Sequence, residues 1–328
     1  MGFEARIDPE LREGLALYEA LGITAEALTA ERLPATRVHM AEFLATALAE
    51  IPPNERVVRE DRTIPGHDGA DVPVRIYRPD GATGTLPCLV WIHGGGMIVG
   101  TLDSENIACD RYADAVGCVV VSVGYRLAPE HPHPAPVEDC YAALSWAAAN
   151  AEELGIDPER IAVGGASAGG GLAAGTVLAA RDRGGPAIAF QLLVYPMLDD
   201  RELTPSSIEF PGILSWSTAH NRVGWAHLLA GRAGADDVDH YAAPARATEL
   251  SGLPPALIQV GELEVFRDED IDYAVRLLRA GVPTELHVYP GAYHAWDLTS
   301  PEAAATVRMV EERIRALRTA LHPQTAAV

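Results

Sequence analysis

The strongest constraint on the fold is the segment Gly165-Ala166-Ser167-Ala168-Gly169, which has the pattern G-x-S-x-G. An apolar run at residues 161–164 precedes it, and a helix of small residues follows it. This order predicts a buried strand, a sharp turn and a helix. The residues around the serine must be small, because larger side chains would collide with the neighbouring strand or helix. The turn is predicted to hold Ser167 above a sheet, at the N-terminus of the helix.

A second motif, His93-Gly94-Gly95-Gly96, follows an apolar strand pattern at residues 87–92. Three consecutive glycines leave their backbone N–H groups unshielded. The N–H groups of Gly94, Gly95 and Gly96, together with that of Ala168, are therefore predicted to form an oxyanion hole for an acyl-transfer intermediate. Taken alone, a glycine triplet after a strand is equally typical of a flexible turn. The downstream G-x-S-x-G favours the oxyanion hole.

Apolar strand patterns alternate with helical patterns along most of the chain. A polar turn at residues 67–70 between the first two strands is typical of a hairpin. The later strands are almost continuously apolar, which indicates a mostly parallel sheet covered by helices on both faces. Eight strands are predicted, at residues 56–63, 72–77, 88–92, 118–123, 160–164, 189–194, 256–260 and 285–289.

Two segments lie outside this alternation. Residues 1–50 contain two helical patterns before any strand, at 9–21 and 36–51, and about sixty residues separate the sixth and seventh strands. Such an interval is too long for a bare loop in a compact domain. We expect residues 1–50 and 199–240 to form a helical cap over Ser167. Residues 51–198 and 241–328 would then form the catalytic core.

A histidine and a carboxylate are predicted to complete a site with Ser167. His294 is the first histidine after the last predicted strand, beyond a turn that contains glycine, and Glu264 follows the strand before it. The carboxyl ends of parallel strands meet at one edge of a sheet, so these side chains should lie near Ser167. Glu262 and Asp268 are the alternative acids. Glu262 would point to the other face, and Asp268 is placed to cap a helix.

Four blocks of the sequence resemble the hormone-sensitive-lipase-like branch of the α/β-hydrolases, which includes bacterial acetyl esterases and heroin esterase. They cover most of the chain and are His93–Gly96, Tyr125–Glu130, Gly165–Gly170, and Gly261–Asp268 with His294. The resemblance implies an α/β-hydrolase fold, short acyl substrates and no cofactor. It also implies that His93 holds the oxyanion loop and that Arg126 pairs with Glu130 beneath it. The chain departs from the family at Ala166, where Asp is usual, and in the acid loop at residues 264–268.

These motifs predict a serine carboxylesterase that acts through an acyl-enzyme, and the family resemblance implies that its substrates are short-chain acyl esters. Met97 and Trp216 are the predicted substrate contacts, and no metal site is expected. A lactonase or amidase with the same triad is an alternative. A receptor that binds a small ligand without turning it over is another, but such receptors lose a triad member.

Composition limits the partners. The chain has 25 Lys and Arg against 46 Asp and Glu, a formal net charge of −21. That charge repels nucleic acid and anionic lipid surfaces. The N-terminus lacks the apolar run of a signal peptide, no stretch suits a membrane helix, and the four cysteines lack metal-type spacing. We therefore expect a cytoplasmic enzyme with a small-molecule ester as its partner. A homodimer stays open.

Overall fold

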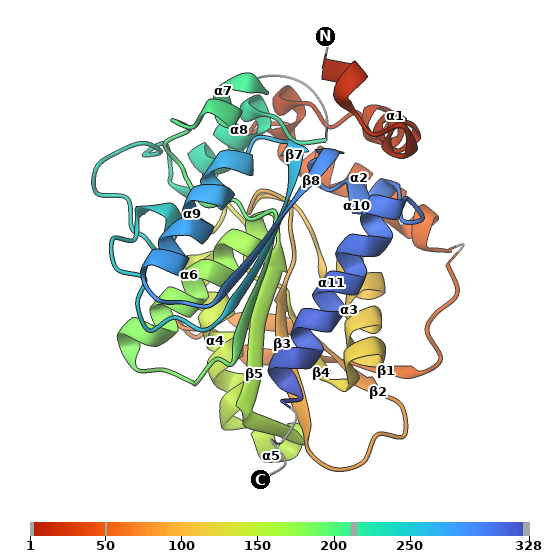
Figure 1. Cartoon of the computed structure of the whole chain (residues 1–328), viewed down its shortest axis with the longest axis vertical. Coiled ribbons are helices and arrows are strands. Elements are labelled where there is room, and N and C mark those ends of the chain that lie inside the picture. Colours follow the sequence, from red (N-terminus) through yellow and green to blue (C-terminus); the bar gives the residue numbers. More distant parts are fainter. Residues whose placement is uncertain (1–2, 50, 211–214, 324–328) are drawn as a thin grey trace.

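In the computed structural model, which describes residues 3–49, 51–210 and 215–323, eight strands form a single sheet (Figure 1). Their order is β1-β2-β4-β3-β5-β6-β7-β8. β1 pairs antiparallel with β2, and β2 with β4, whereas all other neighbours are parallel. The strands are β1 (Val57–Pro65), β2 (Asp71–Pro79), β3 (Leu86–Ile92), β4 (Val119–Val123), β5 (Ile156–Ala166), β6 (Phe190–Val194), β7 (Ala256–Leu263) and β8 (Thr284–Tyr293). The predicted hairpin and eight-stranded, mostly parallel sheet are confirmed.

Helices cover both faces of the sheet (Figure 1). One face carries α4 (Ala135–Ala149), α6 (Ala168–Arg183) and α9 (Arg267–Arg279), and the other carries α3 (Asn106–Tyr112) and α11 (Ala304–Leu321). Side chains of β3 alternate between the two resulting cores. Val90 packs in the core that contains α6, whereas Leu89 and Trp91 pack in the core that contains α11. Burial on both faces explains why the central strands are apolar at nearly every position.

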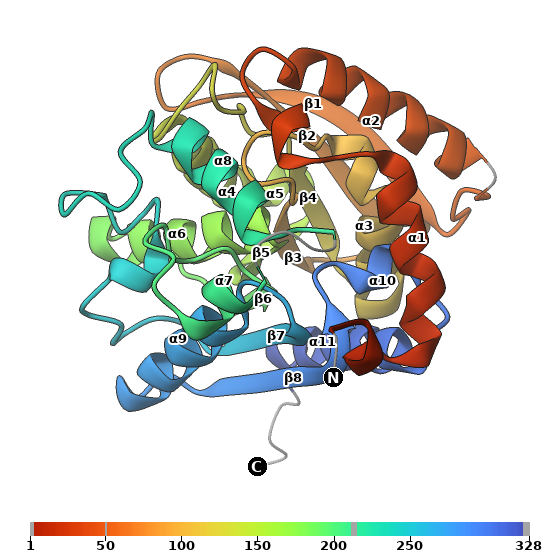
Figure 2. The ribbon, with the colours of Figure 1, turned by 90° about the horizontal axis from the view of Figure 1, so that it is seen from above.

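Two segments from distant parts of the sequence lie over the carboxyl ends of the parallel strands (Figure 2). The first contains η1 (Phe3–Arg6), η2 (Pro9–Leu11), α1 (Arg12–Leu21), η3 (Ala25–Leu28) and α2 (Leu33–Ala49), and the second contains α7 (Pro205–Glu209) and α8 (Thr218–Leu228). Two hydrogen bonds join the segments. Nε2 of His220 donates to the carbonyl of Ile23 at 2.9 Å, and Nε2 of His227 donates to the carbonyl of Leu28 at 2.9 Å. Both segments therefore border the edge of the sheet where Ser167 lies.

The remaining helices are short or begin and end at other residues than predicted. They are η4 (Leu102–Glu105), the π-turn η5 (Ala113–Gly117), α5 (Ala151–Leu154), η6 (Pro244–Arg246) and α10 (Trp296–Thr299). The pattern at 36–51 begins earlier, at Leu33, because Pro34 is tolerated in the first turn, where its missing N–H has no helical partner. α3 ends at Tyr112, where the π-turn η5 begins.

The expected ion pair between Arg126 and Glu130 is wrong. Arg126 instead donates to both carboxylate oxygens of Asp139, at 2.9 and 2.8 Å, and pairs with Asp68. Asp139 is completely buried in α4 and needs a cation, whereas Glu130 reaches Arg37 of α2 at 2.8 Å. Glu130 therefore ties the N-terminal segment to the core.

Candidate active site

Ser167 occupies a strained turn between β5 and α6. Its φ of 57° and ψ of −121° fall in a region that L-residues rarely adopt. Neighbouring backbone holds it there, because Ser167 N donates to the carbonyl of Val194 at 2.8 Å. The chain also passes β3 very closely: a Cβ at Gly169 would lie 2.1 Å from the carbonyl oxygen of Ile92. The elbow thus requires glycine at this position.

The structure brings Ser167, His294 and Glu264 together in one hydrogen-bonded line. Nε2 of His294 lies 2.9 Å from Oγ of Ser167, and Nδ1 lies 2.5 Å from Oε2 of Glu264. The exposed fractions of Ser167, His294 and Glu264 are 7%, 4% and 1%, so the line is shielded from bulk water. With Nδ1–H donating to the carboxylate, Nε2 of a neutral imidazole is left to accept the serine proton.

The strand ends and the surrounding rings fix this geometry. Glu264 follows β7 directly, and its Oε1 accepts a hydrogen bond from Gly261 N at 2.6 Å. His294 follows β8 directly, and its imidazole lies between the rings of Tyr195 and Phe266, with centroid distances of 4.7 and 5.1 Å. The Ser215 hydroxyl donates to the carbonyl of His294. Few rotations of the imidazole are therefore open.

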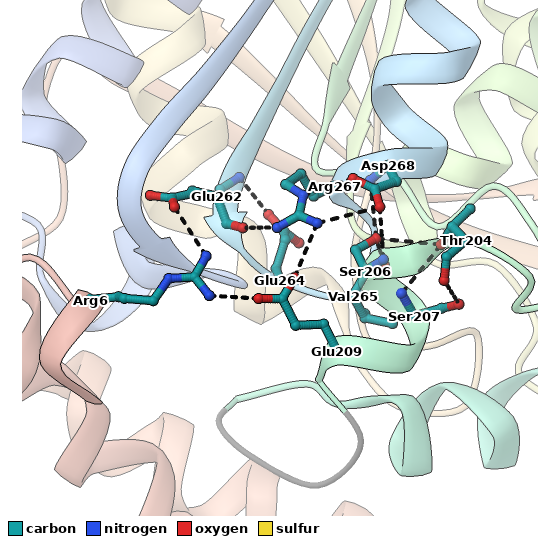
Figure 3. Close-up of polar contacts among 11 residues, drawn as sticks. Arg6, Thr204, Ser206, Ser207, Glu209, Glu262, Glu264, Val265, Arg267 and Asp268 are labelled. Carbon is teal, nitrogen blue, oxygen red and sulfur yellow. Dashed lines mark hydrogen bonds and ion pairs between the residues drawn. The ribbon is translucent and has the colours of Figure 1, made fainter. Parts of the chain in front are cut away.

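Both alternative acids bind partners other than His294, and Figure 3 shows their contacts with Arg6, Ser206 and Arg267. Asp268 accepts from Ser206 N at 2.8 Å and from Arg267 Nε at 2.8 Å. Burial opposes ionisation of Asp268, but these hydrogen bonds outweigh it and lower its pKa. Glu262 accepts from Gly291 N at 2.9 Å and pairs with Arg6. Glu262 therefore binds residues of β8 and η1, and Asp268 binds a residue of α7.

The expected N-cap role of Asp268 is wrong. Phe266 holds the N-cap position of α9, and Asp268 lies inside the first turn of that helix. From there its carboxylate reaches the start of α7, where the N–H of Ser206 lacks a helical partner. Asp268 consequently links α9 to α7.

This link predicts the effect of Asp268→Asn. The variant would lose the charge that holds Ser206 N and Arg267, and we expect about 1 kcal/mol lower stability because Asp268 is partly exposed. Turnover should change by less than about threefold, since Asp268 does not reach His294. Urea unfolding and ester hydrolysis by the same sample measure both quantities. A loss of activity larger than that of Glu264→Gln would make Asp268 the acid of the triad.

The glycine loop lies against Ser167. A Cβ at Gly94 would lie 3.4 Å from Cβ of Ser167, and Gly94 and Gly95 both line the cavity described below. The described residues offer no backbone acceptor to the N–H of Gly94, Gly95 or Ala168. Gly96 differs: a Cβ there would lie 2.3 Å from the Trp216 ring, and Gly96 does not line the cavity. The N–H groups of Gly94 and Gly95, which line the cavity, and of Ala168, which directly follows Ser167, are therefore the candidates to receive an oxyanion.

His93 supports this loop. Its ring stacks on that of Tyr125 at a centroid distance of 4.1 Å, and its Nδ1 donates to the carbonyl of Gly94 at 2.7 Å. Burial lowers the pKa of His93 to about 4, so the ring is neutral near pH 7. These contacts suit a structural residue.

A cavity of about 240 Å³ opens beside Ser167 and His294. Its outer part is largely apolar and is lined by Tyr18, Ile23, Leu28, Met40, Trp216 and Leu298. Trp216 thus lies where a substrate contact was predicted. The prediction for Met97 is wrong, because Met97 is completely buried and does not line the cavity. Its positive φ of 61° accompanies a side chain packed near Gly171, inside the core.

Sequence reasoning missed the residues that hold the imidazole. Tyr195 directly follows β6, the neighbour of β5, so its position at the carboxyl end of a parallel strand was a usable signal. Its φ of 36° is a second strained position beside the elbow. Phe266 lies in the acid loop, where only the carboxylates had been considered. Ser215 had no recognisable signal.

No group of three His, Cys, Asp or Glu side chains in residues 3–49, 51–210 and 215–323 is arranged to hold a metal ion. Across the same ranges, no helix has the length and apolar character needed to cross a bilayer.

Comparison with known proteins identifies the family. The family model for the alpha/beta hydrolase fold matches residues 89–298. The chain belongs to the α/β-hydrolase family. Within this family, the predicted place in the hormone-sensitive-lipase-like branch is confirmed by the esterases that the chain resembles.

These α/β-hydrolase relatives share most of their length with the chain. It is 40% identical to the carboxylesterase NlhH of Mycobacterium tuberculosis over 83% of this chain and 85% of the relative. It is 32% identical to an ethyl acetate hydrolase of Pseudomonas putida over 88% of this chain and 91% of the relative. The solved structure of bacterial heroin esterase superposes with a TM-score of 0.89 and 43% identity, covering 97% of this chain and 98% of that structure.

Proposed function

We propose that the protein is a serine carboxylesterase that hydrolyses short-chain acyl esters through an acyl-enzyme. The observation that carries the proposal is the buried line from Ser167 through His294 to Glu264 at the carboxyl edge of the sheet. Relatives named carboxylesterase, ethyl acetate hydrolase and heroin esterase support a small-molecule ester as the substrate.

The proposed mechanism uses each of these groups in turn. His294 Nε2 takes the proton of Ser167 as Oγ attacks the ester carbonyl, and Glu264 stabilises the imidazolium. The N–H groups of Gly94, Gly95 and Ala168 stabilise the oxyanion. His294 then protonates the leaving alcohol. A water molecule, activated by the same imidazole, hydrolyses the acyl-enzyme and regenerates Ser167.

The segments 1–50 and 199–240 are proposed to act as the cap, because residues of both line the outer cavity. Trp216 is the cap residue that limits acyl length, since its ring packs directly on the glycine loop.

Four free, buried cysteines support a reducing compartment such as the cytoplasm. β8 is an edge strand with Val288 exposed, which supports pairing of two copies there. Size-exclusion chromatography with light scattering tests that pairing.

A panel of p-nitrophenyl esters from two to twelve carbons tests the function and the role of Trp216 together. The wild-type protein should be fastest between two and six carbons. Trp216→Ala should shift the optimum to longer chains by at least two carbons, because it removes the ring that closes the apolar cavity. Trp146→Ala is a matched control, since Trp146 lies on α4 and does not line the cavity. The proposal fails if no ester in the panel is hydrolysed.

A further inference from the structure

The lining of the cavity is not confined to Ser167 and the apolar outer part. It also includes Ala166 and side chains on the sheet face covered by α3 and α11. We call this part the inner chamber and define it by Trp91, Ser104, Glu105, Tyr195, Asp297 and Arg313. Apart from Trp91, each of these side chains carries a hydroxyl, carboxylate or guanidinium group. The inner chamber therefore differs in chemistry from the apolar outer cavity.

Two charged side chains of the inner chamber, Asp297 and Arg313, form an ion pair. Asp297 accepts from the Tyr195 hydroxyl at 2.8 Å and pairs with Arg313 Nη1 at 3.1 Å. Arg313 Nε donates in addition to Gln259 Oε1 at 2.7 Å. Since both side chains are at most 8% exposed, the pair is a buried, mutually neutral unit. Neither Asp297 nor Arg313 therefore needs a further hydrogen-bond partner from a ligand.

Glu105 is not satisfied in this way. Its Oε2 accepts from Trp91 Nε1 at 2.6 Å, but the nearest donor to its Oε1 is Ser104 Oγ at 3.5 Å. The single hydroxyl proton of Ser104 is already directed to the carbonyl of Thr101 at 2.6 Å. Among the described residues no basic side chain lies within ion-pair distance of Glu105. Oε1 is consequently an acceptor without a well-placed donor, on a side chain that lines the inner chamber.

The lack of a good donor to Oε1 of Glu105 indicates which chemical group the inner chamber would bind. Burial raises the pKa of Glu105 to about 7, and a buried acceptor that is left without a donor is destabilising. An alkyl group in the inner chamber would displace water and leave Oε1 unpaired. A hydroxyl group would restore the hydrogen bond.

We propose that the inner chamber is a subsite for a hydroxyl group of the ester, which donates a hydrogen bond to Oε1 of Glu105. The preferred substrates are then esters that carry a hydroxyl a few bonds from the carbonyl. Ala166 makes this subsite accessible, because a larger side chain beside Ser167 would fill the passage. The inference rests on the proposed esterase function and adds the chemical class of its substrate.

The hydroxyl can belong to the acyl or to the alcohol half of the ester, and two matched pairs of substrates distinguish these sources. For the acyl half, p-nitrophenyl 3-hydroxybutyrate is compared with p-nitrophenyl 3-methylbutyrate. For the alcohol half, 3-hydroxybutyl acetate is compared with 3-methylbutyl acetate. The members of each pair differ by a hydroxyl in place of a methyl group, so their sizes match.

The measured quantity is the ratio of kcat/KM within a pair, in the wild type and in three variants. We expect the wild type to favour the hydroxyl ester of one pair by about tenfold. Glu105→Leu should reduce that ratio to one or below, and Glu105→Gln, which keeps an acceptor of the same length, should retain most of it. Glu60→Leu, on the exposed edge strand β1, should leave it unchanged. Partial unfolding of a variant lowers both rates equally and does not alter the ratio.

A wild-type ratio of one or below for both pairs would overturn the proposal, as would a ratio above one that Glu105→Leu leaves intact. Failure of the esterase function looks different, because then no member of either pair is hydrolysed. A preference confined to the first pair places the acyl group in the inner chamber, and a preference confined to the second places the alcohol there.

Discussion

Ser167→Ala is expected to lower ester turnover by at least about 10⁴-fold, the largest effect of any single change in this protein. The Ser167 hydroxyl oxygen is the only protein group in the proposed mechanism that forms a covalent bond to the acyl carbon. In other serine hydrolases, removal of one triad member costs about 10⁴–10⁶-fold. The measurement is kcat with p-nitrophenyl acetate after the background rate has been subtracted.

The melting temperature of Ser167→Ala should stay within a few degrees of the wild type. The Ser167 side chain makes one hydrogen bond, to His294, and alanine meets the same backbone strain as serine at this φ. Ser251→Ala is the matched control, because Ser251 is exposed and lies outside the cavity. Activity of Ser167→Ala within tenfold of the wild type would exclude Ser167 as the nucleophile.

Glu264→Gln should lower turnover by at least about 100-fold, which corresponds to about 2.7 kcal/mol of transition-state stabilisation. The amide keeps the length of the side chain but removes the charge that stabilises the imidazolium. It also offers an N–H to His294 Nδ1, which favours the wrong tautomer. The hydrogen bond from Gly261 N to Oε1 can persist, so the loop should keep its shape.

Glu264→Asp provides the matching control. It keeps the charge but is one methylene shorter, so it should retain more activity than Glu264→Gln if the carboxylate still reaches His294. Steady-state kinetics of both variants, beside Asp268→Asn, rank the three effects. Equal activity of Glu264→Gln and the wild type would contradict the role of Glu264.

Motif and strand order predicted most of the architecture. Most parallel strands of this chain contain a short apolar run; the His93–Gly96 motif follows β3 directly, and the G-x-S-x-G motif begins at the end of β5. His294 and Glu264 could be selected because both follow parallel strands, which fixes the edge of the sheet where they emerge. These inferences depend on local pattern and on one topological rule.

The missed features depend on long-range packing instead. Arg126 selects Asp139 over Glu130 because Asp139 is buried and needs a cation, and burial is invisible in the sequence. Met97 is completely buried in the core, with a positive φ that its sequence does not reveal. The inner chamber joins Glu105 and Asp297, which lie far apart in the chain and meet only across the sheet face covered by α11.

Covalent labelling tests the central claim, that Ser167 is a nucleophile activated by His294 and Glu264, most directly. The native protein is treated with a fluorophosphonate, digested, and mapped by mass spectrometry. A single phosphonyl group on the peptide that contains Ser167 is the predicted result, with labelling much slower in His294→Ala and after denaturation. Labelling of a different serine, or equal labelling of Ser167 in the denatured chain, would contradict the account.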